Sequence, residues 1–77
     1  MNKEDRQKFV RLATKRVSNA LKAMQLIGNL SNRSNYDYTD ADVQKIFKAL
    51  QDELSACRKR FNVARKREGA ETRFSLD

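Results

Sequence analysis

Apolar residues recur at helical spacing through the first third of the chain. They follow one another at alternating steps of three and four, at Val10, Ala13, Val17, Ala20, Met24 and Ile27. This spacing places them on one stripe of an α-helix. Asn2 is a typical N-cap residue, and carboxylates follow it in the first turn. Gly28 follows the last apolar position, where a left-handed residue commonly ends a helix. We therefore predict a helix over about residues 3–27.

A second helical pattern starts after Thr39. Asp42 stands three residues beyond Thr39, which is a variant of the capping box that opens many helices. Apolar residues then recur at steps of four and three, at Val43, Phe47, Leu50, Leu54, Cys57, Phe61 and Ala64. We call these seven residues the seam; their heptad spacing is typical of a coiled coil. The pattern predicts a helix over about residues 40–66, and Gly69 is expected to break it.

These two patterns predict an all-α fold. A single polar loop separates them, so we expect an antiparallel two-helix hairpin over residues 1–68 with a short tail at 69–77. Phe74 and Leu76 in that tail are expected to pack on the first helix. The alternatives are two continuous helices that pair only with a second chain, and a homodimer that completes a four-helix bundle. Apolar residues outside the main stripe of the first helix favour more than one neighbour: Phe9, Leu12, Ala23 and Leu26.

Composition limits the chemistry that the chain can perform. The sequence has no histidine and one cysteine, which argues against a zinc site and excludes an internal disulfide. Cys57 falls on the seam and is interpreted as a packed thiol. The carboxylates Asp40 and Asp42 suit a helix start, while Asp52 and Glu53 suit a solvated surface. We therefore predict no enzyme activity, no cofactor and no metal.

The expected location is the cytoplasm. A lone cysteine and a charged start, MNKEDRQKF, are typical of an intracellular protein. No segment approaches the roughly 20 apolar residues that a membrane span requires, so no membrane partner is expected.

The net charge of +7 favours an anionic partner, either nucleic acid or an acidic protein surface. Residues 58–67 hold six basic side chains and no acidic one. An antiparallel hairpin would bring them beside the basic start of the first helix. The alternative is a solvated face with no partner. The candidate nucleic-acid-binding residues are Arg6, Arg11, Lys15, Arg58, Lys59, Arg60, Arg65, Lys66 and Arg67.

The polar loop at 28–39 is a second candidate contact surface, because long loops often carry function. Its aromatic rings and amides suit stacking and adaptable hydrogen bonding. The alternative is that Leu30 and Tyr36 close the open end of the hairpin while asparagines satisfy the turn backbone. The candidate partner-contact residues are Asn32, Arg33, Asn35, Tyr36 and Tyr38.

The run LIGNLSNRSNYDYTDADVQKIFKAL, residues 26–50, resembles a segment of small uncharacterised helical proteins of bacteria and mobile elements. The resemblance implies that the loop and the second helix form one unit, and it implies no activity.

Two functions are therefore predicted. The first is a small basic non-catalytic protein that binds nucleic acid or a nucleoprotein complex through its basic end, as a regulator or accessory factor. The alternative is a protein-interaction module, either a homodimeric bundle or an inhibitor or adaptor that docks on an acidic partner.

Overall fold

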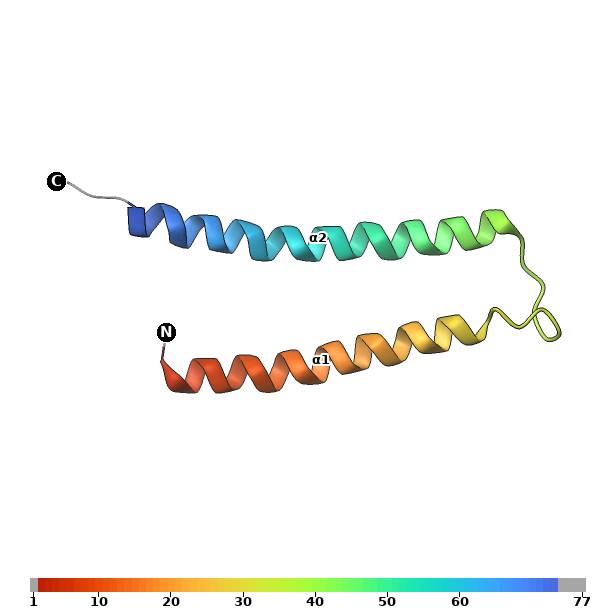
Figure 1. Cartoon of the computed structure of the whole chain (residues 1–77), viewed down its shortest axis with the longest axis horizontal. Coiled ribbons are helices and arrows are strands. Elements are labelled where there is room, and N and C mark those ends of the chain that lie inside the picture. Colours follow the sequence, from red (N-terminus) through yellow and green to blue (C-terminus); the bar gives the residue numbers. More distant parts are fainter. Residues whose placement is uncertain (1, 74–77) are drawn as a thin grey trace. The chain divides into compact units, whose positions relative to one another are not determined.

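Two long helices account for most of the chain (Figure 1). The structure, a computed structural model, describes the backbone of residues 2–73 and the side chains of residues 2–67. Helix α1 spans Lys3–Asn29 and helix α2 spans Asp40–Arg73. The described residues contain no strand, so the predicted all-α fold of two helices joined by a loop is confirmed. The helices belong to separate structural units, Met1–Asp37 and Tyr38–Asp77.

Helix α1 begins at the predicted cap. Asn2 has an extended backbone, with φ of −96° and ψ of 171°, and its side-chain oxygen accepts a hydrogen bond from the Asp5 N–H at 2.8 Å. The Asn2 carbonyl accepts from the Arg6 N–H at 3.1 Å. Glu4 and Asp5 lie in the first turn, where their charges stabilise the positive end of the helix dipole.

Helix α1 does not end in the predicted way. Gly28 lies inside the helix, and no described residue has a left-handed φ. The helix ends instead by tightening, because the Leu30 N–H donates to the Ile27 carbonyl and the Ser31 N–H to the Gly28 carbonyl, each at 3.0 Å. A glycine in a helix costs about 1 kcal/mol relative to alanine. That cost is too small to stop the helix, which runs two residues beyond the predicted end at about residue 27.

Asn32 organises the loop between the helices, residues 30–39. Its side-chain oxygen accepts from the Ser34 N–H at 3.0 Å, which is the pattern of an Asx turn. Its backbone carbonyl accepts from the N–H groups of Asn35 at 3.1 Å and Tyr36 at 3.0 Å. One asparagine thus satisfies three backbone donors in a segment without regular structure.

Helix α2 starts as predicted and ends later than predicted. Thr39 and Asp42 form a reciprocal capping box, and the Thr39 carbonyl accepts from the Val43 N–H at 3.2 Å. The helix then continues through Gly69 to Arg73. Gly69 therefore does not break it, and residues 69–73 of the predicted tail are helical. Phe74 and Leu76, which were expected to pack on the first helix, lie outside the described residues.

The described side chains include no buried residue. The best-covered apolar positions are only half-buried, and they are Leu12, Ala13 and Ile27 in α1 with Val43 and Leu50 in α2. The predicted burial of the seam is therefore not found, and Cys57 is exposed, not packed as expected. Burial depends on what covers a helix face, whereas the start of a helix depends on capping residues within its own segment.

Candidate nucleic-acid interface

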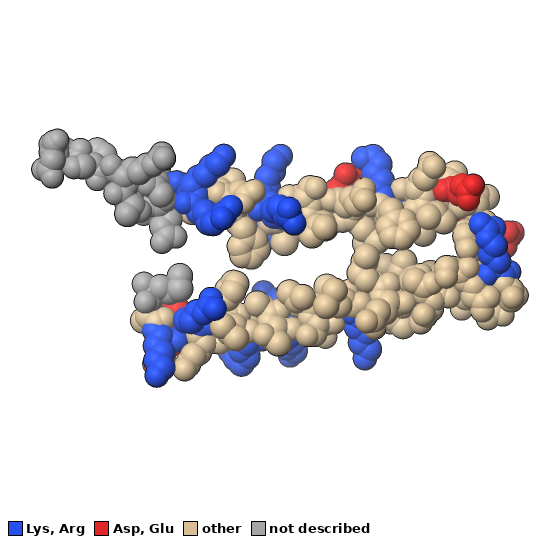
Figure 2. All heavy atoms as spheres, in the orientation of Figure 1, with Lys and Arg blue, Asp and Glu red and all other residues tan. Residues whose placement is uncertain are grey.

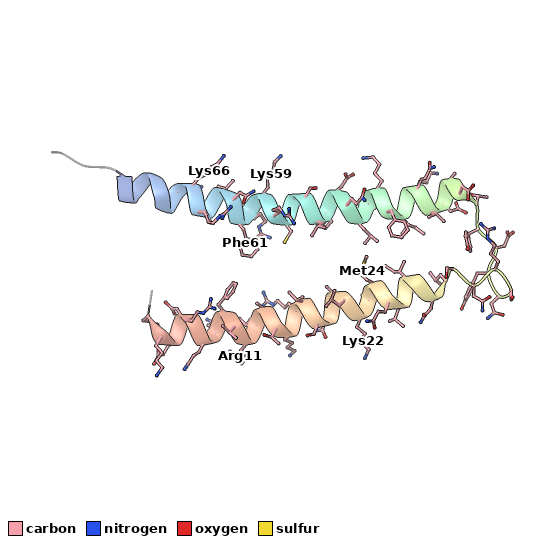
Figure 3. All side chains as sticks on the ribbon, viewed as in Figure 1. Arg11, Lys22, Met24, Lys59, Phe61 and Lys66 are labelled. Atoms are coloured by element: carbon pink, nitrogen blue, oxygen red, sulfur yellow. The ribbon has the colours of Figure 1, made fainter. Side chains whose placement is uncertain are left out.

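Part of the basic charge of α1 lies opposite its apolar stripe. Figure 3 shows Arg11 and Lys22 on one side of α1 and Met24 on the other. Lys15 follows Arg11 by one helical turn, so these two predicted site residues share a face. Arg6 differs from them, because its guanidinium carbon lies 5.9 Å from the centre of the Phe9 ring. That distance is typical of a cation–π contact.

The basic residues of α2 form two identical triplets, Arg-Lys-Arg at 58–60 and again at 65–67. Seven residues are almost two turns of helix, so each member of one triplet lies nearly above its counterpart in the other, about 10 Å along the axis. The six side chains are all exposed. The sequence alone shows this repeat. It indicates which of the six basic residues share a face of the helix.

The basic side chains of the two triplets project in three directions around α2. At 100° per residue, Arg58 and Arg65 lie along one edge of the seam, while Arg60 lies along the other. Lys59 and Lys66 lie opposite the seam. Figure 3 shows this directly, since Lys59 and Lys66 project from one side of α2 and Phe61 from the opposite side.

Asn62 lies among these basic side chains. It is half-buried, and its side-chain oxygen accepts a hydrogen bond from Nη2 of Arg65 at 2.8 Å. Asn62, Arg65 and Lys66 line a shallow hollow. The hydrogen bond holds the Arg65 guanidinium beside the hollow while leaving its other N–H groups available to an anion. We call this surface the basic face, and its residues are Arg58, Lys59, Asn62, Arg65 and Lys66.

Among the side chains that the structure describes, no carboxylate pairs with the basic face. None of its four cations forms an ion pair with a described side chain, whereas Lys48 and Asp52 pair at 3.0 Å nearer the start of the helix. The carboxylates with described side chains in α2 precede the two Arg-Lys-Arg triplets, in the first turn and at Asp52 and Glu53. Figure 2 shows the acidic side chains of α2 nearer its start than its main cluster of basic ones. Residues 58–67 therefore form a segment of strong positive charge, which attracts anions.

The loop candidates are arranged differently. Asn32 is occupied by the turn that it organises. Tyr36 is 48 % exposed and Tyr38 is half-buried. Leu30, which was expected to close the end of a hairpin together with Tyr36, is also exposed. The loop therefore presents one open aromatic ring, and its role as a contact surface stays a prediction.

The remaining chemistry of the described residues is sparse. They contain no group of three or more histidine, cysteine, aspartate or glutamate side chains placed to hold a metal ion. Neither α1 nor α2, over its described residues, has an apolar run of the length that a membrane span needs. The predicted meeting of Arg6, Arg11 and Lys15 with the basic residues of α2 stays a prediction.

Comparisons with protein-family models, with curated proteins and with solved structures find no match to this chain.

Proposed function

We propose that the chain is a small non-catalytic protein that binds nucleic acid, or a nucleoprotein complex, through the basic face of α2. The observation that supports this proposal is the gathering of four exposed cations around Asn62, with no described carboxylate paired to them. A solvated surface that serves only solubility usually mixes both signs of charge. A face of one sign, along two turns of helix, suits a polyanion.

The spacing of the basic face fits a phosphate backbone. Residues 58–66 rise by about 12 Å along the helix axis at 1.5 Å per residue. Duplex DNA carries one phosphate charge per roughly 1.7 Å of its axis, so several phosphates fall within reach of the four side chains. Arg65 can present two N–H groups to one phosphate, while the lysines act as point charges.

Such a face positions a protein on nucleic acid without reading its sequence. Flexible lysines contact phosphates and carry no base information. The proposed role is accordingly that of a regulator or accessory factor in the cytoplasm, where a lone thiol such as Cys57 stays reduced.

The test is charge reversal on the basic face. Lys59→Glu combined with Lys66→Glu should weaken binding to a fluorescently labelled 20-base-pair duplex at least tenfold, measured by anisotropy. The matched control is Lys22→Glu combined with Lys45→Glu, which changes the net charge equally at positions outside the face. Equal losses in both variants would show a diffuse effect of net charge and would overturn the proposal.

A second candidate function is a protein-interaction module, and a separate observation favours it. Large apolar side chains remain exposed on both helices, including Leu21 at 59 % and Leu26 at 60 % in α1, and Leu54 at 61 % and Phe61 at 57 % in α2. Contiguous exposed apolar surface commonly marks an interaction site. Light scattering coupled to size exclusion tests this function, because a monomer of unchanged mass at every concentration would exclude a homodimer.

A further inference from the structure

The seam of α2 forms a continuous apolar stripe that remains open to solvent. Phe47 is 47 %, Leu54 is 61 % and Phe61 is 57 % exposed, and Val43 and Leu50 are only half-buried. Three heptads of alternating spacing are enough to form the core of a coiled coil with one other helix. The identity of that helix can be argued from charge.

Charge along α2 changes sign near its middle. Residues 40–53 hold four carboxylates and two lysines, whereas residues 58–67 hold six cations and no carboxylate. A second copy of α2 placed antiparallel would set each acidic half beside a basic half. A parallel pairing would instead set the two basic segments side by side, with strong repulsion.

Helix α1 complements the basic half of α2 less well. Its only carboxylates are Glu4 and Asp5, and residues 3–16 also hold six basic side chains. Like charges placed together across an interface oppose association. A second α2 therefore complements the charge of the basic half better than α1 does.

We infer that the seam binds the seam of a second copy of this chain, in antiparallel orientation. The inference rests on the second candidate function and can be tested separately from nucleic-acid binding. Lys59 and Lys66 of the basic face point away from the seam (Figure 3), while Arg58 and Arg65 border it. The inference specifies the partner, a second copy of the chain, and the antiparallel orientation of its helix α2.

The heptad spacing of the seam allows registers that differ by seven residues, one of which has the following layers. Antiparallel alignment about the midpoint between Ser55 and Ala56 sets Phe47 level with Ala64 of the other copy. The same alignment sets Leu50 level with Phe61 and Leu54 level with Cys57 in the other copy. Two of these three layers then join a large side chain to a small one, which favours close packing. Val43, the remaining residue of the seam, lies level with position 68, which is outside the seam.

The edge of the seam supports the same register. Glu53 and Arg60 are seven residues apart and share one edge of α2. In this alignment Glu53 lies about 3 Å along the axis from Arg60 of the other copy, within reach of both side chains. Shifting the alignment by one heptad, to a centre at residue 52, would bring Glu53 beside its own counterpart, and like charges placed together across an interface oppose association.

Disulfide trapping in the full-length chain tests the orientation. Two variants are made in a Cys57→Ser background, one with Phe47→Cys and one with Ala64→Cys. We expect neither variant to form a disulfide dimer alone, because equivalent residues would lie about 26 Å apart along the axis. Mixing the two variants under mild oxidation should give a disulfide heterodimer, seen as a doubled mass on a non-reducing gel.

The other outcomes overturn the inference. Disulfide dimers formed by each variant alone would show that the two seams pair in parallel. That result would contradict the antiparallel orientation but would still support the seam as an interaction surface. No heterodimer from the mixture would exclude the register. Because Phe47→Cys removes a large apolar side chain, the mass of the unmodified chain is measured in parallel by sedimentation. If the unmodified chain is a monomer at about 100 μM, the proposed pairing is wrong regardless of the disulfide results. DNA binding by that monomer would still support the proposed function of the basic face.

A charge swap gives a second readout that leaves the seam intact. Glu53→Arg should raise the dimer dissociation constant at least fivefold, because the new arginine of each copy would lie beside Arg60 of the other copy. Adding Arg60→Glu to Glu53→Arg should restore the dissociation constant to near its original value. A double variant as weak as the single variant would contradict the pairing of these two edges.

Discussion

Thr39 and Asp42 exchange hydrogen bonds at the start of α2. The Thr39 N–H donates to the Asp42 carboxylate at 2.9 Å, and the Asp42 N–H donates to the Thr39 hydroxyl at 3.1 Å. Each side chain thereby satisfies a backbone donor that the helix itself leaves unpaired. This exchange fixes where α2 begins, and so it fixes the position of the seam and of the basic face further along the helix.

Removing this cap should weaken α2. We expect Thr39→Ala to lower the free energy of unfolding by about 1 kcal/mol, the usual effect of losing an N-cap side chain. Asp42→Ala should do the same, and the double variant should lose less than the sum because both side chains serve one cap. Thermal unfolding followed by circular dichroism measures these changes. Thr39→Ser keeps the hydroxyl and is the control; a Thr39→Ala variant as stable as this control would contradict the cap.

Gly28 gives a prediction of opposite sign. It lies inside α1 without a left-handed φ, and a Cβ added there would meet no other atom within 4 Å. Gly28→Ala should therefore stabilise α1 by roughly 0.5–1 kcal/mol, because alanine loses less backbone entropy in a helix. Helicity at 222 nm and the midpoint of thermal unfolding should both rise. A fall in either would support a left-handed helix end at Gly28.

The caps were predictable from the sequence because each depends on residues that are three positions apart. Asn2 and Thr39 bond to the backbone of their own helices, and no other part of the chain is involved. The ends of the helices were less predictable. Glycine only biases a helix to stop, and at Gly28 and Gly69 the helix continues.

The candidate site was predictable in part. The six cations at 58–67 are evident in the sequence, and the Arg-Lys-Arg repeat places them on faces once α2 is known to be helical there. The hydrogen bond from Arg65 to Asn62 depends on rotamers, which no sequence pattern specifies. The exposure of Cys57 was missed for a similar reason, because heptad spacing marks a face without identifying what covers it.

The loop and the basic face can be separated as binding surfaces. Tyr36 is the open ring of the loop, at 48 % exposure, and it lies outside the basic face. We expect Tyr36→Ala to change affinity for duplex DNA less than twofold, because phosphate contacts need no aromatic ring. Anisotropy titration measures this. A loss of tenfold or more would move the binding site to the loop, since stacking on one base contributes about 1–3 kcal/mol.

The proposed pairing through the seam makes stability depend on concentration. An isolated amphipathic helix gains little from its apolar face until another helix covers it. Raising the chain concentration from about 5 to 500 μM should therefore raise the unfolding midpoint by several degrees. Leu54→Asp should abolish that dependence, whereas Ser55→Asp, on the neighbouring solvated position, should preserve it. A midpoint that is constant across this range would contradict the pairing.

The salt dependence of DNA binding tests the central proposal most directly. Four phosphate contacts from Arg58, Lys59, Arg65 and Lys66 predict a slope of roughly −3.6 in a plot of log affinity against log salt, at −0.9 per contact. Affinity for the labelled duplex should then fall about 100-fold between 50 and 200 mM salt. Lys59→Glu combined with Lys66→Glu should reduce the magnitude of the slope by roughly 2. Binding that is absent at 50 mM salt, or that does not change with salt, would contradict the proposed function.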